Sequence, residues 1–145
     1  MNTRLSVAAH ILTFLHVLAG KPVTSELLAA SINTNPSLVR RLLIQLGQAG
    51  LTRSKMGAGG GALLARPADR ITLLDVRRAV GETAAVFPLH PSPNMACPVG
   101  RNIGAALDMR VRAVQRAMEA ELARTTIAQL AAEVAEFESQ RPAQG

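Results

Sequence analysis

The chain of 145 residues is long enough for one domain with its own hydrophobic core. Its net charge of +6 favours a polyanionic partner, and an aromatic content of 2% argues against a protein that stacks single-stranded bases on aromatic rings. One cysteine excludes an internal disulfide and fits a reducing compartment, and no apolar run approaches membrane-spanning length. We therefore expect a cytoplasmic protein with no membrane partner.

The positive charge is concentrated in the N-terminal part of the chain. Residues 1–81 hold ten Lys and Arg against three Asp and Glu, giving +7, whereas residues 82–145 hold six against seven, giving −1. A uniformly basic protein would not show this difference in net charge between its two parts. The distribution predicts that the N-terminal part carries the surface that meets the polyanion.

The first two predicted elements are helices. Apolar residues recur at helical spacing from about residue 3 to residue 18, and the sequence Gly-Lys-Pro at residues 20–22 ends this helix. Thr24 or Ser25 is expected to cap a second helix that runs through Ala30.

A third helix follows a polar break at residues 33–35. Asn35 suits the N-cap and Pro36 the first helical position, and the helix is expected to end at Gly47 or Gly50. Its expected buried face consists of Leu38, Val39, Leu42, Leu43 and Leu46. Its polar face consists of Ser37, Arg40, Arg41 and Gln45. Two short helices joined by a tight break, with arginines on the second, are typical of a helix-turn-helix that reads duplex DNA.

Two strand candidates and a glycine-rich loop come next. Residues 51–55 and 62–66 flank the loop at residues 57–61, which predicts a two-stranded wing. A loop so rich in glycine can lie close to another backbone. Thr72 then caps a helix from residue 73 to residue 80, which Gly81 ends.

The C-terminal part is predicted to contain two helices. Three prolines exclude a stable helix from residue 82 to residue 95, a long helix follows from Pro98 to about Arg124, and Thr125 or Thr126 caps a last one through Phe137. The predicted fold is mainly α, a winged helix-turn-helix domain with a long C-terminal dimerisation helix. The expected divisions are the winged helix-turn-helix domain (residues 1–81), a proline-rich loop (82–97), dimerisation helices (98–138) and a tail (139–145).

The long helix carries an apolar stripe with spacings of 4, 4, 3, 4 and 4 residues. The stripe consists of Ile103, Leu107, Val111, Val114, Met118 and Leu122. It packs either on its own domain or in a homodimer, and we favour the homodimer because so long a helix overhangs a small winged-helix core. A two-fold dimer places two recognition helices on half-sites at least one duplex turn apart, which predicts an inverted-repeat operator.

From residue 23 to residue 81 the chain resembles the winged-helix transcription regulators of the IscR/NsrR/CymR (Rrf-two) family. The resemblance rests on the wing sequence SKMGAGGGALLAR (residues 54–66), on residues 71–76 and 79–81, and on the long helix followed by TTIAQL (residues 125–130). Met56 and Ala62 depart from the family pattern, which usually has Arg and Tyr at these positions. The resemblance implies a homodimeric DNA-binding regulator, most often a repressor.

The candidate DNA contacts form two groups. Ser37 and Arg41, with Arg40 as a near rival, are expected to face base edges, because arginine can bond guanine bidentately in the major groove. Contacts with phosphates are expected from Thr24, Ser25, Asn35, Arg53, Lys55 and Arg66. Gly59 and Gly60 complete the candidate set in the wing loop. Any one of these arginines, taken alone, is as often a solvated surface residue as a DNA contact. The arginines together predict that the affinity for DNA falls steeply with salt.

Cys97 is the candidate regulatory residue. Several members of the family that the chain resembles hold an iron–sulfur cluster with three cysteines. A chain with one cysteine cannot form such a site within a subunit, so we expect no metal or cofactor. The sequence CPVGRNI at residues 97–103 is similar to that of single-cysteine relatives. A helix N-terminus favours the thiolate, so oxidation or alkylation of Cys97 is a candidate switch. The alternative is an unreactive, packed cysteine.

Two other functions stay open from the sequence alone. Winged helices also serve as protein-interaction modules, and a small molecule bound between the domain and the long helix can replace the thiol as the signal of a repressor. An enzyme is disfavoured, because the sequence shows no paired carboxylates, phosphate-binding loop or nucleophile–base set.

Overall fold

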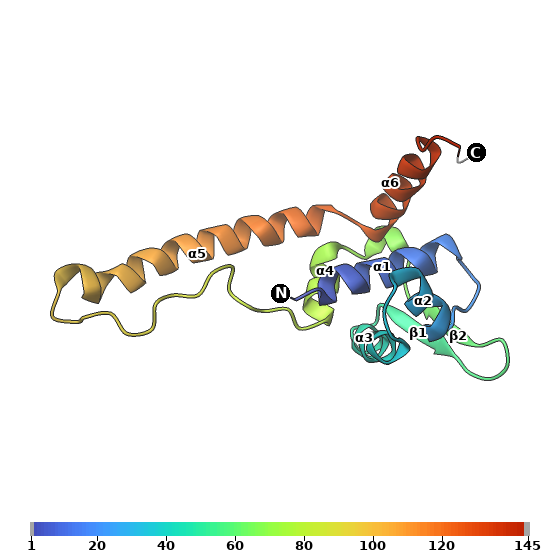
Figure 1. The fold of residues 1–145 in the computed structure, drawn as a ribbon, viewed down its shortest axis with the longest axis horizontal. Coiled ribbons are helices and arrows are strands. Elements are labelled where there is room, and N and C mark those ends of the chain that lie inside the picture. The colour runs from blue at the N-terminus through green and yellow to red at the C-terminus, as the bar shows by residue number, and fades with distance from the viewer. Residues whose placement is uncertain (1, 144–145) are drawn as a thin grey trace.

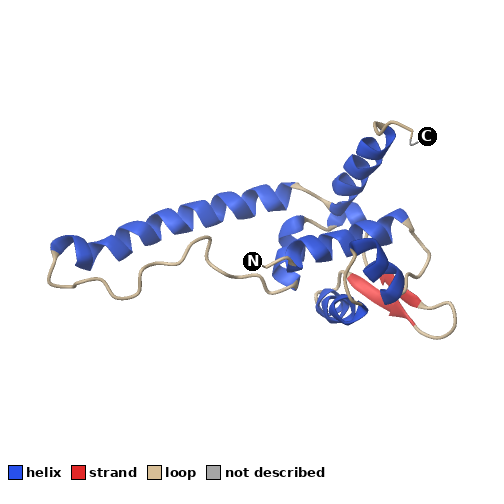
Figure 2. Cartoon of the chain, in the orientation of Figure 1, coloured by secondary structure: helices blue, strands red, loops and turns tan. Residues whose placement is uncertain are grey.

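The computed structural model describes residues 2–143 and shows a small helical core from which one long helix projects (Figure 1). Its helices and strands are α1 (Arg4–Val17), α2 (Ser25–Ile32), α3 (Pro36–Gln48), β1 (Thr52–Lys55), β2 (Gly61–Leu64), α4 (Leu73–Ala79), α5 (Pro98–Arg124) and α6 (Ile127–Ser139). A short 3-10 turn, Ala68–Arg70, precedes α4 and is absent from the sequence prediction. Helices far outweigh the two short strands in the described residues (Figure 2), so the predicted mainly α fold is confirmed.

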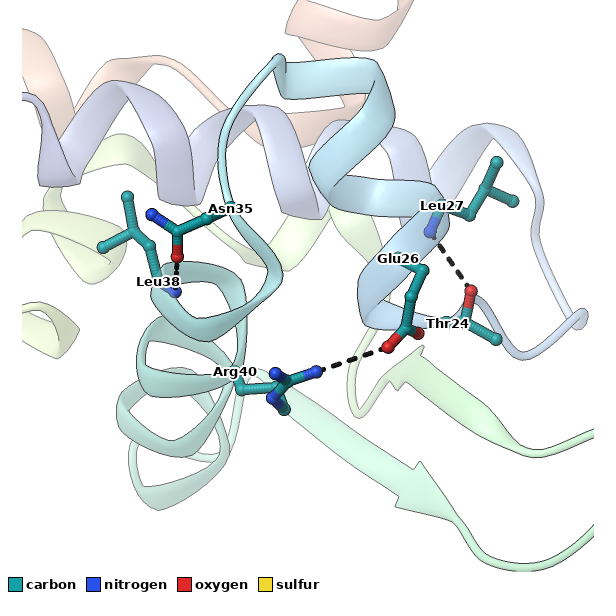
Figure 3. Close-up of polar contacts among 6 residues, drawn as sticks. All are labelled: Thr24, Glu26, Leu27, Asn35, Leu38 and Arg40. Atoms are coloured by element: carbon teal, nitrogen blue, oxygen red, sulfur yellow. Dashed lines mark hydrogen bonds and ion pairs between the residues drawn. The ribbon is translucent and has the colours of Figure 1, made fainter.

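Helices α2 and α3 form the helix-turn-helix, and side-chain caps fix where each begins. The Thr24 hydroxyl accepts a hydrogen bond from the Leu27 amide at 3.2 Å, and the Asn35 side-chain oxygen accepts one from the Leu38 amide at 2.9 Å (Figure 3). Asn33 adopts the left-handed conformation, with φ of 62°, and ends α2 two residues later than predicted. The predicted starts of both helices are confirmed.

The core lies where α1, α3 and α4 meet the beginning of α6. Its largest fully buried side chains are Ile11, Leu12, Leu28, Leu42, Leu46, Leu51, Ile71 and Ile127. In α3, Val39 is buried with Leu42 and Leu46 as predicted, whereas Leu38 and Leu43 are half-buried at the edges of that face. The opposite face of α3 is thus left for contacts outside the chain.

Strands β1 and β2 pair antiparallel, with Lys55 opposite Gly61, so the predicted two-stranded wing is confirmed. Strand β2 also bonds to the segment before α2, because the amides of Val23 and Ala62 each donate to the other's carbonyl, at 3.0 and 2.8 Å. Gly61 has φ of 152°, and a Cβ there would lie 2.5 Å from the Val23 carbonyl oxygen. The absence of a side chain at Gly61 therefore lets the wing pack against the helix-turn-helix.

We expect Gly61→Ala to lower the free energy of unfolding by about 1–3 kcal/mol, because the methyl group strains or separates the contact with Val23. Urea unfolding followed by circular dichroism, at one protein concentration, measures this change. Gly47→Ala is the matched control: its Cβ would meet the Thr52 Oγ1 at an ordinary 3.7 Å, so stability should hold or rise. Equal losses in both variants would contradict the role of Gly61.

Helix α5 projects from the core as an arm, and the loop of residues 82–97 runs alongside it out to its N-terminal end (Figure 1). The predicted bounds of this helix match the structure, and all its residues are described, yet none is buried. Near the core, the guanidinium of Arg77, whose side chain is 8% exposed, pairs with the Glu119 carboxylate at 3.7 Å and ties α4 to α5. Among residues 2–143, no helix has both the length and the apolar character needed to cross a membrane.

Helix α6 turns back and packs on α1 (Figure 1). Its first residue, Ile127, is fully buried, and Thr126 forms an isolated β-bridge with Thr72 of the α4 cap. The range of residues 98–138 thus contains one helix that projects and one that begins inside the core. The division of the chain into domains stays a prediction.

Candidate nucleic-acid interface

The outward face of α3 mixes polar and apolar side chains. Its exposed residues, spaced three, four or seven apart, lie opposite the buried face of the helix. They are Ser37, Arg40, Arg41, Ile44 and Gln48, and Gly47 is exposed beside them. Ser37 and both arginines are exposed as predicted, whereas Gln45, which is also predicted on the polar face, is half-buried. The sequence pattern predicts no role for Ile44.

A hollow between α3 and the wing, here the wing-side hollow, gathers several of the predicted residues. Its lining includes Ser25 at the start of α2, Arg40 and Ile44 on α3, and Arg53 on β1. Arg40 also pairs with Glu26 at 3.3 Å (Figure 3). Both partners are more than half exposed, so the pair contributes only about 0–1 kcal/mol. Arg40 can therefore exchange Glu26 for a phosphate or a base at little cost.

A second hollow, here the α1-side hollow, lies on the other flank of α3. Its lining includes Arg41, Ile44 and Gln45 on α3 together with Arg4 at the start of α1. Arg4 is not among the predicted site residues, because no sequence signal shows that the beginning of α1 lies beside α3. The outward face of α3 is thus flanked by arginines on both sides.

The tip of the wing is exposed. Lys55 and Met56 point outside the core, and Met56 is 87% exposed. The Gly60 amide donates to the Gly57 carbonyl at 3.0 Å, and Gly59 has φ of 72°, so these glycines shape the turn itself. Their contact with DNA stays a prediction.

Arg66 lies apart from the two hollows. Its guanidinium donates to the Arg70 carbonyl at 3.3 Å and lies 3.9 Å from the Asp75 carboxylate. It lines a different hollow, with Leu15 and His16 of α1. Arg66 therefore has a packing role within the chain, and its phosphate contact stays a prediction.

The chain is similar to known transcriptional regulators. Residues 1–133 match the model of the Rrf2 family, whose description is iron-dependent transcriptional regulator. The chain belongs to the Rrf2 family. YwnA of Bacillus subtilis (strain 168), provisionally named an HTH-type transcriptional regulator, is 46% identical over 123 residues, which cover 85% of this chain and 90% of YwnA. The Rrf2 family is one of transcriptional regulators rather than of enzymes.

Solved structures share the fold of this Rrf2-family chain. A protein provisionally described as DNA-binding is 40% identical, with a TM-score of 0.71 over 88% of this chain and 97% of that one. CymR, described as the global cysteine regulator of B. subtilis, is 23% identical, with a TM-score of 0.70 over 92% of this chain and 96% of that one. At that identity, CymR supports the fold alone. The predicted winged-helix fold with a long C-terminal helix is confirmed.

The apolar stripe of α5 forms a second candidate surface. Val114 is 44% exposed, Ile103 39% and Leu107 37%, while Val111, Met118 and Leu122 are half-buried. An amphipathic helix of 27 residues without a buried side chain leaves its apolar face open to solvent in a single chain. A partner helix would cover that face.

Cys97 occupies the N-cap of α5 and is half-exposed. The backbone amides of Gly100 and then of Val99 face the sulfur and lower the pKa of the Cys97 thiol. The Cys97 amide donates to the Asn94 carbonyl at 3.2 Å, so a turn holds the residue at the end of the arm. The thiol is therefore accessible and biased toward the thiolate.

The family description names iron, which in proteins is held by several His, Cys, Asp or Glu side chains that lie close together. Residues 2–143 contain no group of three or more His, Cys, Asp or Glu side chains placed to share a metal ion. Cys97 stands at the start of α5, whereas His10 of α1 bonds to the Ser31 hydroxyl at 2.9 Å. The side chains of residues 2–143 in one chain therefore do not fit an iron centre.

Proposed function

We propose that this protein is a homodimeric, sequence-specific DNA-binding regulator that acts as a repressor in the cytoplasm. The observation that carries the proposal is the outward face of α3, which lies between two arginine-bearing hollows and beside an exposed wing. A helix of this kind fits the major groove, and the flanking cations face the phosphates on either side. The provisional description of the 40% identical structure as DNA-binding supports the same function.

The contacts divide by position. Ser37, Arg40 and Arg41 are proposed to reach base edges from α3. The proposed phosphate contacts are Thr24, Ser25, Asn35, Arg53, Lys55 and Arg66, with the Gly59 and Gly60 backbone near the duplex at the wing. The Thr24 and Asn35 side-chain oxygens already accept from helix amides, so these residues position the helix ends that meet the phosphates.

We expect the affinity for duplex DNA to fall steeply with salt. The three cations proposed at phosphates, Arg53, Lys55 and Arg66, make about six phosphate contacts in a dimer and displace the counterions there. Affinity should therefore fall about 1000-fold between 50 and 200 mM salt. Fluorescence anisotropy with a labelled duplex from the protein's own upstream promoter measures this slope. If the affinity barely changes with salt, the proposed DNA binding is wrong and a protein-interaction module is favoured instead.

Regulation through Cys97 is the finer part of the proposal. The N-cap places the thiol at the far end of the arm from the Arg77–Glu119 pair, which joins α5 to α4 and so to the DNA-binding core. Oxidation or alkylation of the thiolate changes the arm at a site proposed to lie beside the dimer partner.

We expect peroxide or quinone treatment to abolish DNA binding by the wild type and to leave Cys97→Ser unaffected, as measured by anisotropy. Because the thiolate reacts and its pKa is lowered, the rate of inactivation should level off at a lower pH than for an ordinary thiol. Equal sensitivity of Cys97→Ser would exclude the thiol as the switch. If treatment changes the DNA binding of neither protein, the assignment as a DNA-binding regulator stands and a small-molecule signal is favoured over the thiol.

A further inference from the structure

Ile44 is an apolar side chain at the centre of a polar surface. It is 61% exposed and lies on the outward face of α3, seven residues after Ser37, four after Arg40 and three after Arg41. The residues of α3 that are buried in the core are Val39, Leu42 and Leu46, on the opposite face of the helix. Packing within the chain therefore does not account for an isoleucine at this position.

The surroundings of Ile44 indicate the chemistry of what it meets. It lines both the wing-side hollow, with Arg40 and Arg53, and the α1-side hollow, with Arg4 and Arg41. Ile44 is thus an apolar ridge between two pairs of cations. A complementary partner combines negative charge on both sides with an apolar group between them.

We propose that Ile44 contacts the C5-methyl group of a thymine in the major groove and so makes each half-site selective for thymine at one position. This inference rests on the proposed function. Among the base edges of the major groove, thymine presents the apolar group. The flanking arginines meet guanine acceptor atoms, in the case of Arg40 and Arg41, and the phosphates of the two strands. The branched side chain of Ile44 is stiff at χ1 on a helix, so it presents a defined surface to that methyl group.

The test compares thymine with deoxyuridine, which keeps the base pair and the groove hydrogen bonds but lacks the methyl group. Duplexes are first selected from a random library with the wild-type protein, and each thymine is then replaced singly. At one thymine in each half-site, replacement should weaken wild-type binding about fourfold, the value for one buried methyl group. Ile44→Ala should bind the thymine and deoxyuridine duplexes equally.

Two further variants keep the test interpretable. Val17→Ala removes an apolar side chain of 63% exposure from α1, outside both hollows, and should keep the fourfold difference. Ile44→Val removes one methyl group from the same position and should give an intermediate difference. Circular dichroism of each variant verifies that the helices are intact.

The outcomes separate this inference from the proposed function. Wild-type binding that is insensitive to deoxyuridine at every thymine overturns the contact and leaves DNA binding standing, as does an Ile44→Ala variant that keeps the fourfold difference. Failure of the wild type to select any duplex overturns the proposed function and this inference with it. In that case, the outward face of α3 is expected to bind an acidic protein that carries an exposed apolar side chain.

Discussion

In the proposed homodimer, Val114→Asp is expected to separate the two chains and to lower the affinity for an inverted-repeat duplex by about 100-fold or more. Val114 lies in the middle of the α5 stripe and is 44% exposed in the single chain. In a two-fold dimer, the substitution brings two carboxylates into an apolar contact, where they lack partners and repel each other. Sedimentation equilibrium measures the mass, and anisotropy measures the affinity.

The loss of affinity follows from geometry. A dimer that holds two copies of α3 at a fixed separation binds its second half-site at a high effective concentration, and a monomer loses that advantage without losing any contact. The variant should therefore keep weak, salt-dependent binding to a single half-site. Its helix content should be unchanged, because Val114 is 44% exposed and lies outside the hydrophobic core of the single chain.

Met109→Asp is the matched control on the same helix. Met109 is 68% exposed and lies on the face of α5 away from the stripe, so an acidic side chain there should leave mass and affinity unchanged. Monomers in both variants would show that α5 tolerates no added charge, and dimers in both would contradict the stripe as the interface.

The sequence predicts the fold well where the signals are local. Thr24, Asn35 and Pro36 mark helix starts by their own chemistry, and Pro98 begins the long helix for the same reason. Gly61 is recognised as part of a loop suited to close approach, although its actual neighbour, Val23, is visible only in the structure. Caps and turns depend on a few adjacent residues, which a single sequence contains in full.

The rest depends on tertiary packing, which a single sequence does not encode locally. The grouping of α6 with the dimerisation helices stays a prediction; that Ile127 lies in the core and that the helix packs on α1 are visible only in the structure. Arg66 looks like a surface cation but contacts Asp75 and a backbone carbonyl. In α3, the apolar spacing correctly predicts that Val39, Leu42 and Leu46 are buried. It predicts nothing about Ile44, because apolar periodicity identifies the face of a helix that packs on the core.

The double variant Arg40→Ala/Arg41→Ala is expected to lower affinity for the selected duplex by about 1000-fold or more. It removes two arginines from each half of the proposed dimer, and each arginine in contact with a base is worth roughly 1–3 kcal/mol. The two side chains extend into different hollows, so their effects should be close to additive. Folding should be unaffected, because both side chains are exposed and the Glu26 left without its partner is 70% exposed. Anisotropy at one salt concentration gives the affinity, and repeated selection from the library gives the change in preferred sequence.

Arg112→Ala/Arg116→Ala is the matched control, because it removes the same charge from exposed positions on α5. If the arginines of α3 act through local contacts, this control should lose less than about threefold in affinity and keep the preferred sequence. Equal losses in the two double variants would mean that the total charge of the chain drives binding, and the assignment of α3 as the reading helix would be wrong. A loss confined to the α3 variant, with a relaxed preference at the guanines that Arg40 and Arg41 contact, would place sequence recognition on the outward face of α3.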